Sequence, residues 1–175
     1  TGDLVFCGAP GTSLNLMTLL PDINWPLIAH HLTQLAVAYV LSVPIGWNRE
    51  AASRGVGLRT FPLVAIACCA YLLIGRDVLS GSESHARLMY GLMSGIGFIG
   101  GGAILKQEGT VSGTATAAAI WSTGAIGTAV AWQRYEIAIV VSIITVITLR
   151  ALSPLKRFAH SNDKRKKRYR ETHGE

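Results

Sequence analysis

The sequence predicts an all-α, polytopic membrane protein with about five transmembrane helices. Half of its 175 residues are hydrophobic and only 15% are charged. Several apolar runs approach the ~20 residues that a helix needs to cross a bilayer. Small residues gather in the third and fourth of these runs, where helices would have to approach each other closely. A chain of this length fits one domain, so we expect no second soluble module.

Five apolar runs predict the helices, at residues 27–47, 58–75, 88–105, 112–132 and 135–149. The fourth run is built almost entirely of Ala, Gly, Thr and Ser, which makes a poor lipid-facing surface. We therefore expect it to pack inside, against the third run. The fifth run is rich in Ile and Val, so we expect lipid on most of its sides.

The runs divide the chain into three regions. Residues 1–26 are expected to form a periplasmic or interfacial tail, because Gly8-Ala9-Pro10-Gly11 breaks any helix there. Residues 27–152 are expected to form the transmembrane domain, and residues 153–175 a basic cytoplasmic tail.

The third run is unusual because residues 87–106 contain six glycines. In a membrane, glycines let two backbones approach and gain dispersion contacts, so we expect this run at the packed centre of the protein. The same residues fit G-x-G-x-x-G, but the preceding strand and following acidic residue of a dinucleotide site are missing, and packing is favoured. The glycines expected to pack between helices are Gly91, Gly95, Gly97, Gly101, Gly113, Gly124 and Gly127.

The distribution of basic residues predicts the orientation, because cytoplasmic helix ends carry an excess of Lys and Arg. With the N-terminus outside, the cytoplasmic side receives four basic residues near helix ends and nine in residues 150–175, against three outside. The C-terminus is therefore expected in the cytoplasm. We expect the basic run at residues 164–170 to meet anionic lipid headgroups rather than nucleic acid.

Charged residues close the first expected helix and open the second. Arg49 and Glu50 end the first, Arg59 begins the second, and the connection between them is short. Ionisable residues at membrane depth are costly and usually paired, so these three are candidates for one polar cluster at the cytoplasmic boundary. The alternative is that they are ordinary loop charges in water.

Other polar residues give weaker signals. His30 and His31, with Gln34, lie in the first turns of the first expected helix, where an interfacial role is favoured over a metal site. The sequence shows no set of Ser, His and acid residues and no cluster of metal-ligand type. We therefore expect no enzymatic activity and no resident cofactor.

Motifs along the chain follow one another in a recognisable order: Ile45-Gly46-Trp47-Asn48-Arg49-Glu50, Gly57-Leu58-Arg59-Thr60, Arg87, Ser94-Gly95-Ile96-Gly97-Phe98-Ile99-Gly100-Gly101-Gly102 and Gly113-x-x-Thr116-Ala117-Ala118-x-x-Trp121. In this order and spacing, the chain resembles the membrane domain of the MgtC/SapB family. The resemblance adds Arg87 to the candidate polar cluster. The chain departs from many relatives in two places: Thr114-Ala115-Thr116 lies where they have Leu-Thr-Thr, and Ser84 lies where they have Asp.

The resemblance implies a multi-pass protein of the bacterial inner membrane, in the short SapB or YhiD-like form without a C-terminal cytoplasmic domain. It implies a role in magnesium homeostasis or in adaptation to low magnesium and acid stress, with transport of Mg²⁺ as one mechanism. The alternative is a non-transporting regulator that binds another membrane protein, such as ATP synthase, through its small-residue helix face. Magnesium stays open as a ligand or substrate, and a homo-oligomer stays open as an assembly.

Overall fold

A computed structural model describes residues 24–52, 57–107 and 110–151. These residues form four labelled helices, α1 (Trp25–Ala52), α2 (Thr60–Val78), α3 (Ser82–Gly102) and α4 (Thr114–Ala131). A further helix, which we call the fifth helix, covers residues 135–151. The all-helical character predicted from the sequence is thus confirmed. Apart from residues 24–26, the expected N-terminal tail and basic tail lie outside the described residues.

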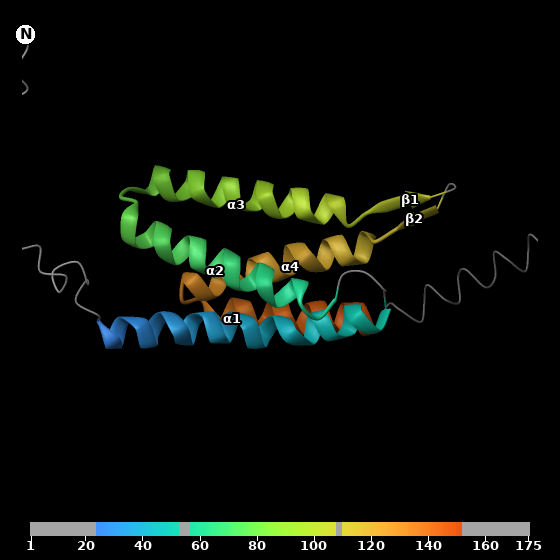
Figure 1. Cartoon of the computed structure of the whole chain (residues 1–175), viewed down its shortest axis with the longest axis horizontal. Helices are drawn as coiled ribbons and strands as arrows, with labels where there is room; N and C mark the ends of the chain where they lie inside the picture. The colour runs from blue at the N-terminus through green and yellow to red at the C-terminus, as the bar shows by residue number, and fades with distance from the viewer. Residues whose placement is uncertain (1–23, 53–56, 108–109, 152–175) are drawn as a thin grey trace, which may run out of the picture.

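The helices lie side by side in an elongated bundle (Figure 1). α2 and α4 occupy the middle, α1 lies on one side of them, and α3 lies on the other. The fifth helix runs beside α1, where the Ser142 hydroxyl donates a 2.6 Å hydrogen bond to the Leu41 carbonyl. In this arrangement α2 and α4 each contact the three other labelled helices.

The centre of the bundle is built around α4. Eleven of its eighteen residues are buried, and most of these are Ala, Gly or Thr. Because such small side chains add little width, neighbouring helices can approach α4 on several sides at once. The expectation that the fourth run packs inside is therefore confirmed.

The expectation that the glycine-rich third helix forms the packed centre is wrong. In α3, Ile96 and Gly100 are the buried residues, while Tyr90 and Phe98 are 78% and 83% exposed. The physical reason is that α3 alternates its glycines with large side chains, of which Tyr90, Met93 and Phe98 are exposed. Only one narrow stripe of α3 meets α4.

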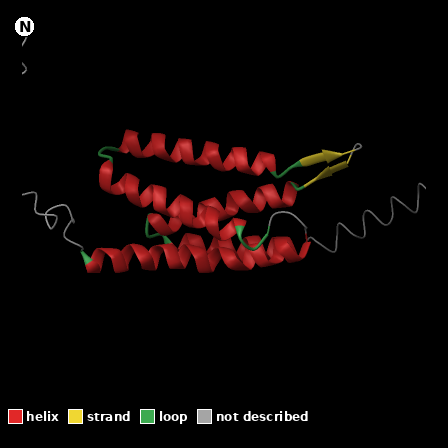
Figure 2. Cartoon of the chain, in the orientation of Figure 1, coloured by secondary structure: helices red, strands yellow, loops and turns green. Residues whose placement is uncertain are grey.

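A short hairpin joins α3 to α4, and the sequence did not predict it. Strand β1 (Leu105–Gln107) pairs antiparallel with β2 (Thr110–Ser112), with Leu105 opposite Ser112 (Figure 2). The expected helical boundaries at residues 105 and 112 are therefore wrong. Gly113 has φ +85°, a left-handed conformation that suits glycine, and it lies against the Ala103 carbonyl oxygen. This close turn lets α4 start directly after β2.

Two of the described helices are long and apolar enough to cross a membrane by length and composition, Trp25–Ala51 and Thr60–Val78. Large apolar side chains are nevertheless exposed on the other helices as well. They include Tyr90 and Phe98 of α3 and Ile143 and Ile147 of the fifth helix. Such exposure over a whole bundle is unusual in water and ordinary in lipid.

Candidate functional site

The boundary between α1 and α2 is held by a contact of Glu50. Its carboxylate Oε2 accepts a 3.0 Å hydrogen bond from the backbone N–H of Leu58. Gly57 leaves room for that carboxylate, because a Cβ on Gly57 would overlap it. One turn earlier on α1, a Cβ on Gly46 would lie 3.2 Å from the Leu58 Cα. The end of α1 and the start of α2 are therefore close together, as the short connection predicts.

The charged residues at this boundary have different surroundings. Arg49 is buried, with 9% exposure, whereas Glu50 and Arg59 are exposed. Two exposed ion pairs lie elsewhere in the described part of the chain, between Arg87 and Glu83 and between Arg134 and Glu136. The Glu50 carboxylate accepts its hydrogen bond from the Leu58 backbone. The structure brings together the helix ends that carry Arg49, Glu50 and Arg59. The polar cluster of these three residues stays a prediction.

Arg87 lies apart from these three residues. It belongs to the first half of α3, near the turn that follows α2, whereas Glu50 and Arg59 lie at the opposite end of the bundle (Figure 1). Its Nη2 donates to Glu83 Oε1 at 2.6 Å, and both side chains are 80% exposed. Within one chain, Arg87 therefore lies outside the α1–α2 boundary.

The glycines named from the sequence have unequal environments. A Cβ on Gly127 would overlap the backbone carbonyl of Ala65 on α2, and one on Gly124 would overlap the Cδ1 of Ile96 on α3. A Cβ on Gly97 would only touch the Trp121 ring, at 3.9 Å. At three other positions, a Cβ would meet no described atom within 4 Å: Gly91, Gly95 and Gly101.

Close approach of the helices also depends on glycines that the sequence analysis did not single out. Gly100 of α3 faces α4, where a Cβ would lie 3.5 Å from the Ala117 carbonyl oxygen. Gly75 of α2 accommodates the Leu88 side chain of α3. The glycine content of α3 could not predict these contacts. A glycine is required only where an atom of the neighbouring helix lies within the space that a Cβ would occupy.

A buried polar side chain links α1 to α4. Gln34 is 1% exposed, and its Nε2 donates a 3.3 Å hydrogen bond to the Val130 carbonyl. Its Oε1 is also buried and has no hydrogen-bond partner among the described residues. Gln34 was grouped with His30 and His31 from the sequence, but His30 is exposed and lies 3.3 Å from Gln133 Nε2. The signal for its burial was an amide inside an apolar helix.

A second polar contact closes the end of α4, and sequence reasoning missed it. The Arg76 guanidinium donates to the Ala131 carbonyl and lies 6.0 Å from the centre of the Trp132 ring. His85 meets the same ring edge-on, with 5.6 Å between ring centres. A cation beside the last carbonyls of a helix is favourable, so Arg76 ties the end of α2 to the end of α4.

No group of three or more His, Cys, Asp or Glu side chains that could hold a metal ion occurs within residues 24–52, 57–107 and 110–151. The oxygens near the centre of the described bundle belong to amide, hydroxyl and carbonyl groups, as in Gln34, Ser142 and Thr123. The Thr123 hydroxyl donates within its own helix, to Ala119 O at 2.8 Å.

The helical bundle has apolar outer faces and two helices long and apolar enough to cross a bilayer, which indicates a helical membrane protein. The chain belongs to the MgtC family, whose family model matches residues 35–158. This match covers the described region from the middle of α1 through the fifth helix.

Three relatives illustrate the similarity. The chain is 38% identical to the protein slr0014 of Synechocystis over 128 residues, which cover 73% of this chain and 54% of the relative. It is 31% identical to protein SrpB of Synechococcus elongatus, over 80% of this chain and 82% of the relative. It is 31% identical to YhiD of Escherichia coli K12, which is named as a candidate magnesium transporter. That match covers 74% of this chain and 63% of the relative. The chain thus spans about half the length of slr0014. No solved structure matches it.

Proposed function

We propose that this protein is a multi-pass protein of the bacterial inner membrane that acts in magnesium homeostasis, without enzymatic activity. Membership of the MgtC family carries this proposal, together with the name given to the YhiD relative. The proposed adaptation to low magnesium or acid stress rests on the same family membership. Two mechanisms are compatible with it: passage of Mg²⁺ through the protein, or action on another membrane protein.

The proposed topology has all five helices crossing the bilayer, with the N-terminus outside and the C-terminus in the cytoplasm. The bias of basic residues supports it, and so does their placement. Arg49, Arg59 and Lys106 belong to the end of the bundle that carries the hairpin, while Arg76 and Arg134 belong to the opposite end (Figure 1). Reporter fusions after Ser161 should be active in the cytoplasm and fusions after Asp22 outside. Both reporters on one side would contradict a five-span path.

Transport of Mg²⁺ is the first mechanism, and Glu50 is the carboxylate proposed to serve it. Mg²⁺ binds oxygen ligands and retains several waters, so one carboxylate repeated in an oligomer could line a hydrated path. Support comes from the position of Glu50 where two helices meet, with its side chain exposed.

Regulation through protein contact is the second mechanism, and an observation on α3 favours it. The outer side of α3 carries Tyr90, which is 78% exposed, and Gly101, where a Cβ would meet open space. A helix face with small residues beside an aromatic can pack closely against a helix of another membrane protein.

Flux of Mg²⁺ into proteoliposomes that contain only this protein separates the two mechanisms. We expect flux above that of empty liposomes, and a loss of that flux in Glu50→Gln. Glu136→Gln is the matched control, because Glu136 is an exposed carboxylate paired with Arg134 at 2.7 Å. Absence of flux at a saturating gradient, with folded protein in the vesicles, would contradict transport and favour the regulatory mechanism.

A further inference from the structure

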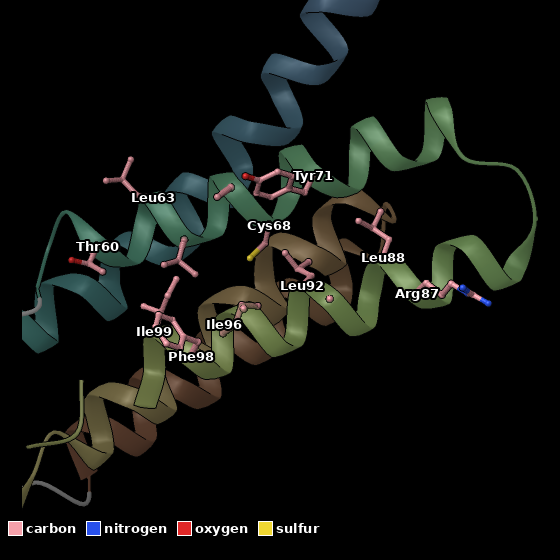
Figure 3. A pocket seen from close by; sticks show the side chains of 14 residues that line it. Thr60, Leu63, Cys68, Tyr71, Arg87, Leu88, Leu92, Ile96, Phe98 and Ile99 are labelled. Carbon is pink, nitrogen blue, oxygen red and sulfur yellow. The ribbon is translucent and has the colours of Figure 1, made fainter. Parts of the chain in front are cut away.

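An open groove runs between α2 and α3 (Figure 3). Its cavity volume is about 780 Å³. Leu63 and Tyr71 of α2 form one wall, and Ile99 of α3 belongs to the other. Gly91 and Gly95 line the α3 side, and a Cβ on either would meet no described atom within 4 Å. At these two positions α3 has no side chain to fill the groove, although other α3 side chains, such as Leu92 and Ile99, line it.

The length of the groove matches one leaflet of a bilayer. Its α3 side extends from Arg87 to Ile99, which at 1.5 Å per residue is about 18 Å. Half of the hydrocarbon core of a bilayer is about 15 Å thick. Thr60, the first residue of α2, lines the far end of the groove. A lipid tail that starts at Arg87 would therefore run along the groove toward the start of α2 and fill most of its length.

The charge of the groove is confined to one end. Arg87 is the one charged residue among the described residues that line it, and Figure 3 shows its guanidinium pointing outward beyond Leu88. The ion pair with Glu83 uses Nη2, whereas a guanidinium carries five N–H donors. Arg87 can therefore hold Glu83 and donate to a phosphate oxygen together.

We propose that the groove between α2 and α3 binds one acyl chain of an anionic phospholipid, with the lipid phosphate on Arg87. An apolar groove of this length with a single guanidinium at its end complements one hydrocarbon tail of a lipid and the negatively charged phosphate above it. This site is separate from the basic run at residues 164–170. It does not depend on whether the protein transports Mg²⁺.

The proposal predicts how side chains at the groove change lipid binding. A leucine at Gly95 should occupy the groove without a clash at its Cβ, because a Cβ there would meet no described atom within 4 Å. Gly102 also has open space at its Cβ but does not line the groove, so Gly102→Leu is the matched control. Arg87→Gln removes the phosphate partner, and Glu83→Gln removes the carboxylate that competes for it.

Native mass spectrometry of the full chain with phosphatidylglycerol, and separately with phosphatidylcholine, tests these variants. We expect one retained phosphatidylglycerol, about tenfold weaker binding in Gly95→Leu, and no change in Gly102→Leu. Arg87→Gln should bring the two lipids to similar affinity, and Glu83→Gln should strengthen phosphatidylglycerol binding. Lipid held by the basic tail is the same in all variants and cancels in the comparison. Thermal unfolding in the same detergent establishes that each variant is folded.

Two results would overturn the proposal. One is equal retention of phosphatidylglycerol by folded Gly95→Leu and Gly102→Leu, which would place the lipid elsewhere. The other is a dimer of the native chain that Gly95→Leu dissociates, without a retained lipid. In that case the groove would be a contact between two copies of this chain.

Discussion

Gly127 of α4 lies against the backbone carbonyl of Ala65 on α2, so closely that a Cβ on Gly127 would overlap the carbonyl oxygen. Both residues are buried, at the level where the two central helices meet. The Ala65 carbonyl belongs to a helix backbone and cannot rotate away as a side chain would. The α2–α4 contact therefore depends on the absence of one methyl group.

Gly127→Ala should destabilise the protein by about 2 kcal/mol, because overpacking at a backbone forces two helices apart. The measurement is thermal unfolding of the purified protein in detergent. Gly101→Ala is the matched control, since its Cβ would meet open space and alanine favours a helix by about 0.5–1 kcal/mol over glycine. Equal melting temperatures for the two variants would contradict the close contact of α4 with α2.

Gly124→Ala should be less harmful than Gly127→Ala, because the atom in its way is the Cδ1 at the end of the Ile96 side chain. The proposed rescue is Ile96→Val, which removes Cδ1 itself. The double variant should regain most of the stability lost in Gly124→Ala, measured by the same unfolding experiment. Additive losses in the double variant would show that Ile96 and Gly124 do not share this contact.

Gln34 should tolerate loss of its amide better than gain of a charge. Gln34→Leu removes the hydrogen bond to Val130 together with the buried Oε1, so stability should change by less than about 1 kcal/mol. Val130 O keeps a partner, because it also accepts from Gln133 N at 2.9 Å. Gln34→Glu should cost about 3 kcal/mol at pH 7, because it places an unpaired carboxylate at a buried position.

The control for the two Gln34 variants is Gln133→Glu, since Gln133 is exposed just after the end of α4. It introduces the same carboxylate where water can solvate it, and its unfolding temperature should stay close to that of the native chain. A loss in Gln133→Glu as large as in Gln34→Glu would mean that burial is not the cause.

Glu50 should stabilise the α1–α2 boundary through the backbone rather than through Arg59. Glu50→Ala should cost about 1 kcal/mol, the usual value of one hydrogen bond, whereas Glu50→Gln keeps an acceptor oxygen for Leu58 N and should cost less. In a double-mutant cycle of Glu50→Ala with Arg59→Ala, the coupling energy should lie near zero. A coupling above about 1 kcal/mol that weakens with salt would restore the ion pair expected from the sequence.

Local sequence was sufficient to predict the helices and the character of α4. Hydrophobic runs of nearly bilayer length fix where helices form, and the Ala, Gly and Thr content of α4 alone made it a poor lipid-facing surface. The short link between Glu50 and Arg59 likewise required two helix ends to meet. These properties depend on residues that are neighbours along the chain.

The tertiary structure decided which glycines matter and where each helix lies. Gly127 and Gly101 look alike in the sequence, yet one meets the Ala65 backbone and the other meets open space. The difference arises because a packing contact depends on the partner helix, which is distant along the chain and leaves no mark on the glycine's own neighbours. For the same reason α3 was expected at the centre although it lies at the side, and its glycines open a groove toward α2.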